Sequence, residues 1–231
     1  FLPSIFMTAV FPVLSRMYAN ASDSLPRLMS KSFNLLLLVS IPVGLGVLVI
    51  ADPLVVLLFG EEFINSGPIL AVMGIVIILT YQNMLLGQFF ISIDRQKDWT
   101  WVMAAATAAT IALDLVLIPW CQRVFGNGAI GGSIAFVITE AGMLFVALRM
   151  LPDGIITWQS SRRSLRAILA GIGMVAATWW ARDLFIAIPI GLGMVSYVAL
   201  ILLLRVVPPE DWDLLKTIGA SFMKRLRKQP A

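Results

Sequence analysis

Long apolar stretches separated by short polar connections fill almost the whole chain. Each complete stretch approaches the roughly 20 residues that a helix needs to cross a bilayer. The stretches carry Leu, Ala and Met throughout and lack the strict two-residue alternation that is typical of strands. The pattern therefore predicts an all-α integral membrane protein of about seven transmembrane helices, over residues 1–14, 33–59, 68–93, 99–120, 128–150, 165–180 and 184–204.

The second stretch, residues 33–59, is longer than one span needs. Pro42 interrupts it, and Asp52 and Pro53 follow. We expect a kinked helix and then a short outer helix, with Asp52 as its N-cap and Pro53 at its first helical position. Gly60 is expected to end that short helix, and the next helix should begin close to Pro68.

Basic residues gather in alternate connections. The first, third, fifth and last connections hold all of the Lys and Arg residues except Arg123 and Arg182, and the second connection carries Glu61 and Glu62 instead. The positive-inside rule then predicts that the odd connections and the C-terminus lie in the cytoplasm, with the chain crossing the inner (plasma) membrane several times. The net charge of +4 therefore indicates topology and gives no reason to expect a nucleic-acid partner.

Composition agrees with this class and narrows the chemistry. Hydrophobic residues make up 59% of the chain and its mean hydropathy is +0.92, whereas soluble domains are about 45–50% apolar. The single cysteine, Cys121, excludes an internal disulfide, and the absence of histidine removes the commonest metal ligand and general base. We expect no catalytic residue, no metal site and no cofactor.

Polar residues inside the apolar stretches are the candidates for function, because they are costly in hydrocarbon. At 100° per residue, Thr100, Thr107, Thr110 and Asp114 share one side of their stretch, where they either line a watery cavity or hydrogen-bond to a neighbouring helix. Asp114 should lie about 8 Å short of the outer end of its helix. Glu140 should lie near the membrane midplane, either as a proton-coupling group or, the favoured interpretation, as a neutral acid bonded to another helix.

The third stretch carries further candidates. Thr80 and Asn83 share a face, and Gln88 lies beside them. Such side chains hydrogen-bond either to sugar hydroxyls or to other membrane helices, and the sequence does not choose between the two. Small residues that include Gly131 and Gly173 predict surfaces where helices pack closely.

The end of the chain differs from the rest. The tail is residues 208–231, and after its two initial prolines residues 210–228 place apolar side chains at helical spacing with basic residues between them. This pattern predicts an amphipathic helix on the cytoplasmic leaflet, and anchoring to anionic lipid is favoured over a partner-binding role.

The chain resembles the C-terminal lobe of the multidrug/oligosaccharidyl-lipid/polysaccharide transporter superfamily. The resemblance covers about residues 1–204. Within the superfamily, the chain is similar in particular to the bacterial polysaccharide flippases of the O-antigen and exopolysaccharide type. The motifs that carry it are Phe-Pro-Val-Leu-Ser-Arg at 11–16, Ile-Pro-Val-Gly at 41–44, Ala-Asp-Pro-Leu at 51–54, Leu-Leu-Phe-Gly-Glu-Glu-Phe at 57–63, Leu-Ile-Pro at 117–119, Gly-Ala-Ile-Gly-Gly-Ser-Ile-Ala at 128–135 and Thr-Glu at 139–140.

The resemblance implies two bundles of six helices around a cavity that opens alternately to each face. Residues 1–160 would then be a partial C-terminal bundle that lacks its first helices, residues 161–207 two additional helices, and residues 208–231 the basic cytoplasmic tail. The chain begins at Phe1 within an apolar stretch, so we expect a longer protein whose N-terminal bundle is a partner of this part. Asp114 stands where many relatives have Asn, so a coupling role cannot be transferred to it. Arg16 is expected either to help bind a pyrophosphate at the cytoplasmic mouth or, the favoured alternative, to anchor the topology.

The function implied is transport, with a proton or a sodium ion as the only coupling ion or cofactor to be considered. The chain would help to flip an undecaprenyl-pyrophosphate-linked oligosaccharide for polysaccharide biosynthesis, with lipid-linked oligosaccharide and membrane lipids as partners, and without enzyme activity. The glycan would cross through a polar cavity while the lipid tail stays in the bilayer. A cation-coupled multidrug exporter of the same superfamily is the main alternative. A membrane-embedded glycan-processing enzyme is the third, disfavoured because such an enzyme should carry a sizeable outer loop or clustered acidic and His residues, whereas the outer connections here are short.

Overall fold

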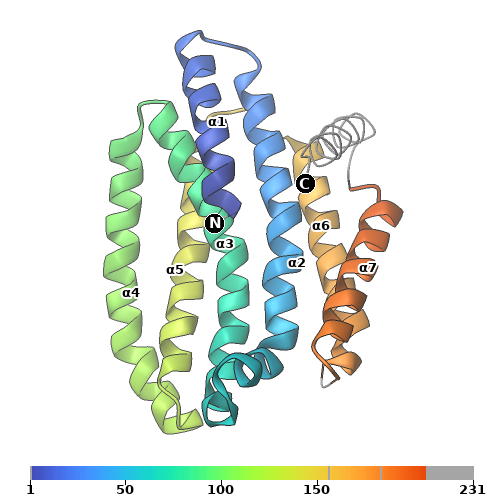
Figure 1. Ribbon diagram of the computed structural model, residues 1–231. Helices are drawn as coiled ribbons and strands as arrows, with labels where there is room; N and C mark the ends of the chain where they lie inside the picture. Colours follow the sequence, from blue (N-terminus) through green and yellow to red (C-terminus); the bar gives the residue numbers. More distant parts are fainter. Residues whose placement is uncertain (1, 156, 183, 207–231) are drawn as a thin grey trace, which may run out of the picture.

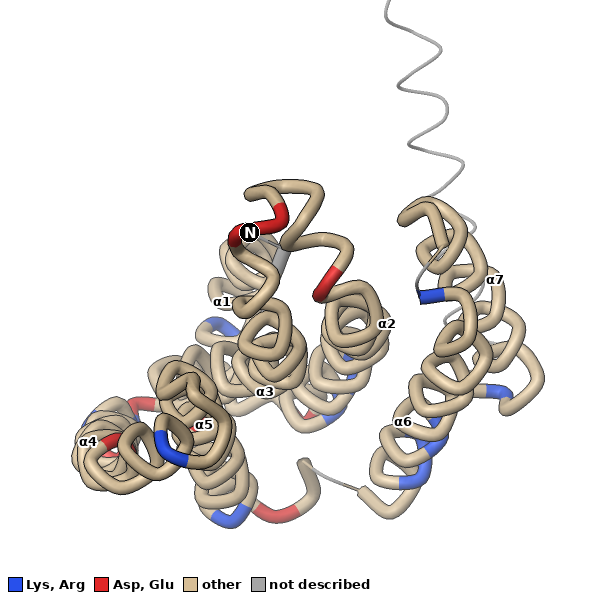
Figure 2. Tube along the Cα trace, turned by 90° about the horizontal axis from the view of Figure 1, so that it is seen from below, with Lys and Arg blue, Asp and Glu red and all other residues tan. Residues whose placement is uncertain are grey.

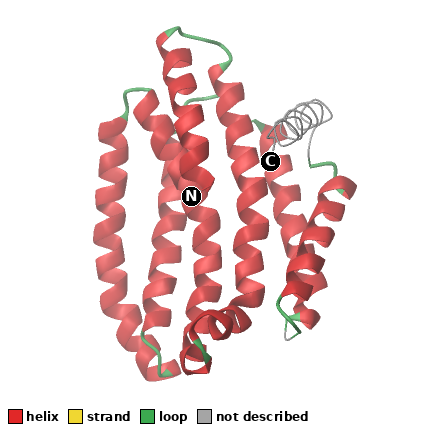
Figure 3. Cartoon of the chain, viewed as in Figure 1, coloured by secondary structure: helices red, strands yellow, loops and turns green. Residues whose placement is uncertain are grey.

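The computed structural model describes residues 2–155, 157–182 and 184–206, and these residues form helices joined by short turns, with no strand among them (Figures 1 and 3). The all-α class that the sequence predicts is therefore confirmed. The elements are α1 (Leu2–Ala19), α2 (Leu25–Phe59), the 3-10 helix η1 (Glu61–Ser66), α3 (Gly67–Ser92), α4 (Gln96–Phe125), α5 (Ala129–Met150), α6 (Trp158–Thr178), the 3-10 helix η2 (Trp179–Ala181) and α7 (Ala187–Leu203).

The outer surface of the bundle is apolar. Five segments of the described chain are long and apolar enough to cross a membrane, namely α2, η1 with α3, α4, α5, and α6 with η2. Helices α1 and α7 are shorter, with 18 and 17 residues. On α4, Trp101 and Leu115 are 76% and 74% exposed, and many other large apolar side chains point outward. Such a surface is stable when lipid surrounds it and is an aggregation liability in water.

Helices α2 and α3 form the middle of the bundle and pack against each other along their length. Helix α5 packs on α3, and α4 packs mainly on α5, whereas α6 and α7 lie on the other side of α2 (Figure 2). Helix α1 rests on α3 and α2. Buried apolar side chains fill two cores, one around α1, α2 and α3 and one between α2, α6 and α7.

The connections alternate between the two ends of the bundle. The turns between α1 and α2, α3 and α4, and α5 and α6 lie at the same end as the last residues of α7 (Figure 1). All the described Lys and Arg residues except Arg123 and Arg182 lie within the helix turns and connections nearest this end. We call it the basic end.

Helix α2 is one helix of 35 residues, so the expected short outer helix after Pro53 is wrong. Both Pro42 and Pro53 lie inside it, and Asp52 is an interior residue rather than an N-cap. Gly60 does end the helix, as predicted, with its N–H bonded to the carbonyl of Val56. Membrane helices tolerate interior proline because neighbouring groups satisfy the backbone carbonyls that proline leaves without a donor.

The carbonyl freed by Pro42 has such a partner. Proline has no N–H, so the carbonyl of Leu38, four residues earlier, has no donor in its own helix. The hydroxyl of Tyr197 on α7 donates to this carbonyl at 2.9 Å. This bond joins α7 to α2 at the position where the helix ladder of α2 is incomplete.

Asp52 has a different position from the predicted one. Its Oδ1 lies so close to Gly67, the first residue of α3, that a Cβ on Gly67 would collide with it. A carboxylate is stabilised at a helix N-terminus by the positive end of the helix dipole. Asp52 therefore faces the start of the neighbouring helix instead of capping its own.

Other helix ends also differ from the predicted spans. Helix α4 continues to Phe125, and α6 begins at Trp158 rather than Leu165, after Thr157, whose hydroxyl accepts a hydrogen bond from the N–H of Ser160. The hydropathy pattern did not include the last turns of α4 and the first turns of α6, because these turns contain polar residues. The predicted tail helix, residues 208–231, lies outside the described residues.

Close backbone contacts set two of the helix crossings. A Cβ on Gly44 of α2 would clash with the carbonyl oxygen of Gly74 on α3, and the reverse also holds. A Cβ on Gly131 of α5 would clash with the backbone of Leu117 on α4. The close packing predicted for Gly131 is confirmed, and such contacts are typical of membrane helices, which gain stability from packing rather than from the hydrophobic effect.

Candidate functional site

A polar cluster joins α3 to α5 in the middle of the bundle. The side-chain amide of Asn83 donates to Oε2 of Glu140 at 2.8 Å and to the backbone carbonyl of the same residue at 2.9 Å. The hydroxyl of Thr80, one turn earlier on α3, donates to the same Oε2 at 3.3 Å. We call these three residues the α3–α5 polar cluster.

The cluster explains how α5 holds a carboxylate at its centre. Glu140 lies at the middle of the helix, as its sequence position predicts. A carboxylate without partners is costly in an apolar medium, whereas donors from a neighbouring helix offset that cost. The predicted hydrogen bonding between Glu140 and another helix is confirmed, with Asn83 and Thr80 as the donors, and these partners come from the face of α3 that the sequence singled out. That Glu140 is a neutral acid stays a prediction.

A groove of about 450 Å³ opens beside the cluster. Gln88 also lines it, so four of the predicted site residues, Thr80, Asn83, Gln88 and Glu140, come together there. The rest of the lining is both polar and apolar and comes from α3, α4 and α5: Met84, Gly87, Ile91, Gln96, Trp99, Thr100, Met103 and Met143. Carboxylate, amide and hydroxyl groups around a groove of this size can bind a hydroxylated or cationic group by hydrogen bonds.

Trp99 and Gln96 also line this groove, and no sequence pattern indicated that they would. The Trp99 ring stacks on Phe90 with centroids 5.8 Å apart. Its Nε1 lies 2.7 Å from where a Cβ on Gly87 would be, so the glycine makes room for the indole. A tryptophan at the start of an apolar helix is typical of a membrane interface, so its place in a groove depends on the packing of α4 beside α3.

Of the polar stripe on α4, only Thr100 lines the groove beside this cluster. The hydroxyls of Thr107 and Thr110 donate to carbonyls of their own helix, those of Met103 and Ala106, both at 2.9 Å. Neither residue lines the groove. The stripe predicted by periodicity is therefore present on one side of α4, but its threonine hydroxyls are satisfied locally.

Asp114 faces α5 at a separate place. Its Oδ1 is buried without a hydrogen-bond partner among the described residues and lies 3.8 Å from where a Cβ on Gly132 would be. Because α4 continues to Phe125, Asp114 is about 16 Å from the end of its helix, not 8 Å. The difference arises because the last turns of α4 include polar residues that hydropathy excluded.

Two further polar residues lie away from the groove. Arg16 is exposed in the last turn of α1, at the basic end. Gln82, next to Asn83 on α3, is only 1% exposed, and both polar atoms of its side chain lack a partner in the described structure. Neither residue lines the groove.

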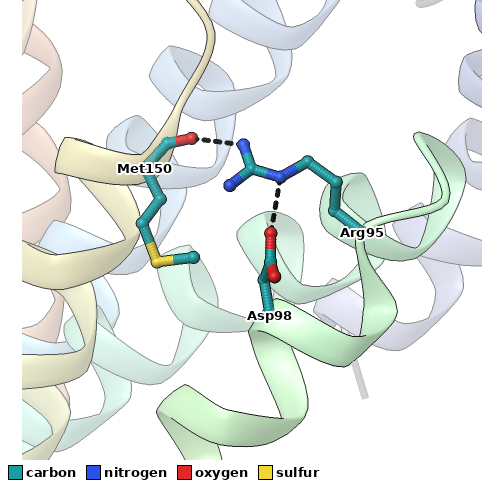
Figure 4. Close-up of polar contacts among 3 residues, drawn as sticks. All are labelled: Arg95, Asp98 and Met150. Carbon is teal, nitrogen blue, oxygen red and sulfur yellow. Dashed lines mark hydrogen bonds and ion pairs between the residues drawn. The ribbon is translucent and has the colours of Figure 1, made fainter.

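Arg95, one of the basic residues on which the topology prediction depends, also connects two parts of the bundle. Its Nε donates to Asp98 at 2.7 Å, and its Nη1 donates to the carbonyl of Met150 at 2.7 Å (Figure 4). The side chain thereby ties the turn between α3 and α4 to the last residue of α5. It holds the basic end of the groove-forming helices together.

A second pocket, of about 190 Å³, lies between α2, α6 and α7. Its lining is almost wholly apolar, with Pro42, Ile50, Met174 and Pro189 among the residues and Thr178 as the polar one. Among the residues that the structure describes, no three His, Cys, Asp or Glu side chains come together in a way that could hold a metal ion.

Comparison with known proteins identifies the family. The family model described as lipid II flippase MurJ matches residues 3–202. No match was found among curated proteins or among solved structures. The family match agrees with the predicted flippase superfamily and with a multi-pass membrane transporter that is not an enzyme, and it gives no support to O-antigen or exopolysaccharide specificity. With nearly all of its membrane-helix region covered by this match, the chain belongs to the MurJ lipid II flippase family.

Proposed function

We propose that this protein flips lipid II, the lipid-linked precursor of peptidoglycan, across the bacterial inner membrane by alternating access, with the basic end in the cytoplasm. The observation that carries the proposal is the family match over residues 3–202. The basic end supports the orientation, since Lys and Arg are enriched in cytoplasmic connections. Lipid II replaces the O-antigen and exopolysaccharide precursors as the first substrate to test.

The α3–α5 polar cluster supports a transport role for this part of the protein. It places a carboxylate, an amide and a hydroxyl beside a groove within an otherwise apolar bundle. The hydrophilic part of the substrate must avoid hydrocarbon during transfer, while its isoprenoid tail stays in the bilayer. Any polar surface that lowers this cost also lowers the barrier to transfer.

Glu140 is our proposed site for coupling to a proton or sodium ion. Oε2 accepts from both Asn83 and Thr80, so a change in its charge would alter the contact between α3 and α5 directly. An ion that changes one helix contact in this way can bias two conformations of a transporter.

The test uses the protein reconstituted into liposomes with fluorescent lipid II, and the rate at which label becomes accessible to an impermeant quencher is measured. We expect transfer of lipid II, and transfer of a lipid-linked O-antigen precursor at no more than one tenth of that rate. Equal rates would refute the lipid II preference, and no transfer of either would refute the flippase proposal.

The same assay tests the coupling site. Glu140→Gln keeps an oxygen that can accept from Asn83 but removes the titratable charge, so the response of the rate to an imposed proton or sodium gradient should be lost. Glu61→Gln is the matched control, because Glu61 is exposed in η1 at the other end of the bundle from the basic connections. If Glu140→Gln retains the full gradient response, Glu140 serves only to pack α5 on α3.

A further inference from the structure

One buried amide on α3 has no hydrogen-bond partner. Gln82 is 1% exposed, and both its Oε1 and its Nε2 are buried without a partner among the residues that the structure describes. Folded proteins pair nearly all such groups, so an exception needs an explanation. Since Gln82 does not line the groove beside Glu140, a role in the candidate site does not supply one.

The surroundings of Gln82 are apolar. Ile78 lies one turn before it on the same side of α3, and Leu85 and Leu86 lie one turn after it. Leu85 and Leu86 are fully buried and belong to the core that α3 forms with α1 and α2. An unpaired amide is costly in such a place, whereas an apolar side chain of the same size is not. Gln82 therefore makes the described packing of α3 less stable than an apolar residue would.

Side-chain hydrogen bonds fasten several of the helix contacts. They join α2 to α6 through Asn34 and Ser160, α2 to α7 through Tyr197, and α3 to α5 through Asn83. Separating these helices would leave polar groups unpaired in an apolar surrounding, which is costly. We therefore expect these contacts to persist when the protein changes conformation.

Helix α1 is held differently. It rests on α3 and α2 through apolar side chains, among them the buried Met7 and Leu14, and the hydroxyl of Thr8 donates to Ile5 within the same helix. Pro12 lies inside α1, and interior prolines are common sites of helix bending. Lipid tails are as apolar as the side chains that α1 contacts, so α1 can separate from α3 at a low cost.

We propose that the contact between α1 and α3 opens around Gln82 in a second conformation of the protein, where the amide gains hydrogen bonds to water. The unpaired amide raises the free energy of the described conformation and so keeps the second one accessible. This inference rests on the proposed alternating access, which requires two conformations of similar free energy. Gln82 then sets the ratio of the two conformations and does not bind the transported molecule.

The first experiment measures stability by titration with SDS in mixed micelles, with helix content followed by circular dichroism. Methionine has nearly the length of glutamine and needs no hydrogen bond. Gln82→Met should therefore raise the equilibrium constant for folding at least about fivefold, because an unsatisfied buried group costs at least that factor. Gln159→Met, the control, makes the same exchange at an exposed position of α6 and should change the constant less than about twofold. If neither Gln82→Met nor Gln82→Leu raises it, the amide is paired in this fold and the proposal is overturned.

The second experiment measures the two conformations by double electron–electron resonance in liposomes. Spin labels are attached at Ile5→Cys on α1 and Ile138→Cys on α5, both exposed positions, in a Cys121→Ala background. We expect two distance populations in this parent. Gln82→Met should deplete the population that differs from the described structure at least about fivefold, and Gln159→Met should leave the ratio within about twofold. A single population in the parent, or an unchanged ratio in Gln82→Met, would refute the opening of this contact.

Neither readout depends on lipid II. If the protein does not flip lipid II but both results are as expected, the proposed function fails and the opening of the contact between α1 and α3 stands. If the protein flips lipid II but Gln82→Met changes neither the stability nor the ratio of distances, this inference alone fails.

Discussion

The bond between Tyr197 and the carbonyl of Leu38 offers a direct test of how α2 tolerates a proline. Tyr197 is 4% exposed, and its hydroxyl lies 2.9 Å from an acceptor that Pro42 leaves without a donor. In Tyr197→Phe the ring still fills its place, but the donor is lost. In Pro42→Ala the new N–H at position 42 can bond the same carbonyl within the helix.

The two changes should therefore be coupled. A buried carbonyl left without a donor costs about 1–3 kcal/mol, and hydrogen bonds between membrane helices contribute about 0.6 kcal/mol on average and up to about 1.7. We expect Tyr197→Phe to lower the free energy of unfolding by about 1–2 kcal/mol when Pro42 is present. When residue 42 is alanine, the same change should cost less than about 0.5 kcal/mol, which makes the coupling energy about 1 kcal/mol.

The free energies are measured by titrating the protein with SDS in mixed micelles and following helix content by circular dichroism. The control is Tyr18→Phe, because Tyr18 is exposed at the end of α1 and should change stability by less than about 0.5 kcal/mol. The same cost for Tyr197→Phe in both backgrounds would refute the explanation, since it would mean that the freed carbonyl is not what the hydroxyl stabilises.

Two further changes test the packing in the same titration. Gly44→Ala places a methyl group against the carbonyl oxygen of Gly74 and should cost about 1–3 kcal/mol, whereas Gly46→Ala meets no atom within 4 Å and should stabilise α2 by about 0.5–1 kcal/mol; equal stabilities would contradict this helix crossing. Arg95→Met removes both the ion pair with its partly exposed neighbour on α4 and the bond to the carbonyl of Met150, and should cost about 1–2 kcal/mol. If the Arg95→Met loss vanishes entirely in high salt, the screened ion pair and not the carbonyl contact accounts for it.

The candidate site was predictable where one periodic pattern decided it. Thr80 and Asn83 share a face because they are three residues apart on α3, and Glu140 lies in the middle of α5 because the apolar stretch is symmetric around it. That these faces meet was not predictable, since periodicity orients a helix about its own axis but does not select its neighbour. In the sequence, Thr110 and Asp114 are polar residues inside an apolar stretch just as the cluster residues are. They lie apart from the cluster because their helix face meets a different neighbour.

The helix ends were also predictable only in part. Gly60 ends α2 as predicted, because it adopts a positive φ of 96° that other residues avoid. Proline predicts a helix end less reliably. It removes one backbone hydrogen-bond donor, and the neighbouring residues decide whether the helix continues. Beside Pro42 the missing donor comes from Tyr197, more than 150 residues away in the chain, so α2 continues. No local pattern contains that information.

Hydropathy and charge along the chain were sufficient for the helical class, the approximate spans and the alternation of basic connections, because these follow from the cost of placing polar groups in lipid and from the distribution of Lys and Arg. Only the folded bundle brought Asn83 to Glu140 and Tyr197 to Leu38. These pairs depend on which small residues let two helices approach and on which buried polar group needs a partner. Both are properties of contacts between segments, and a one-dimensional pattern does not record them.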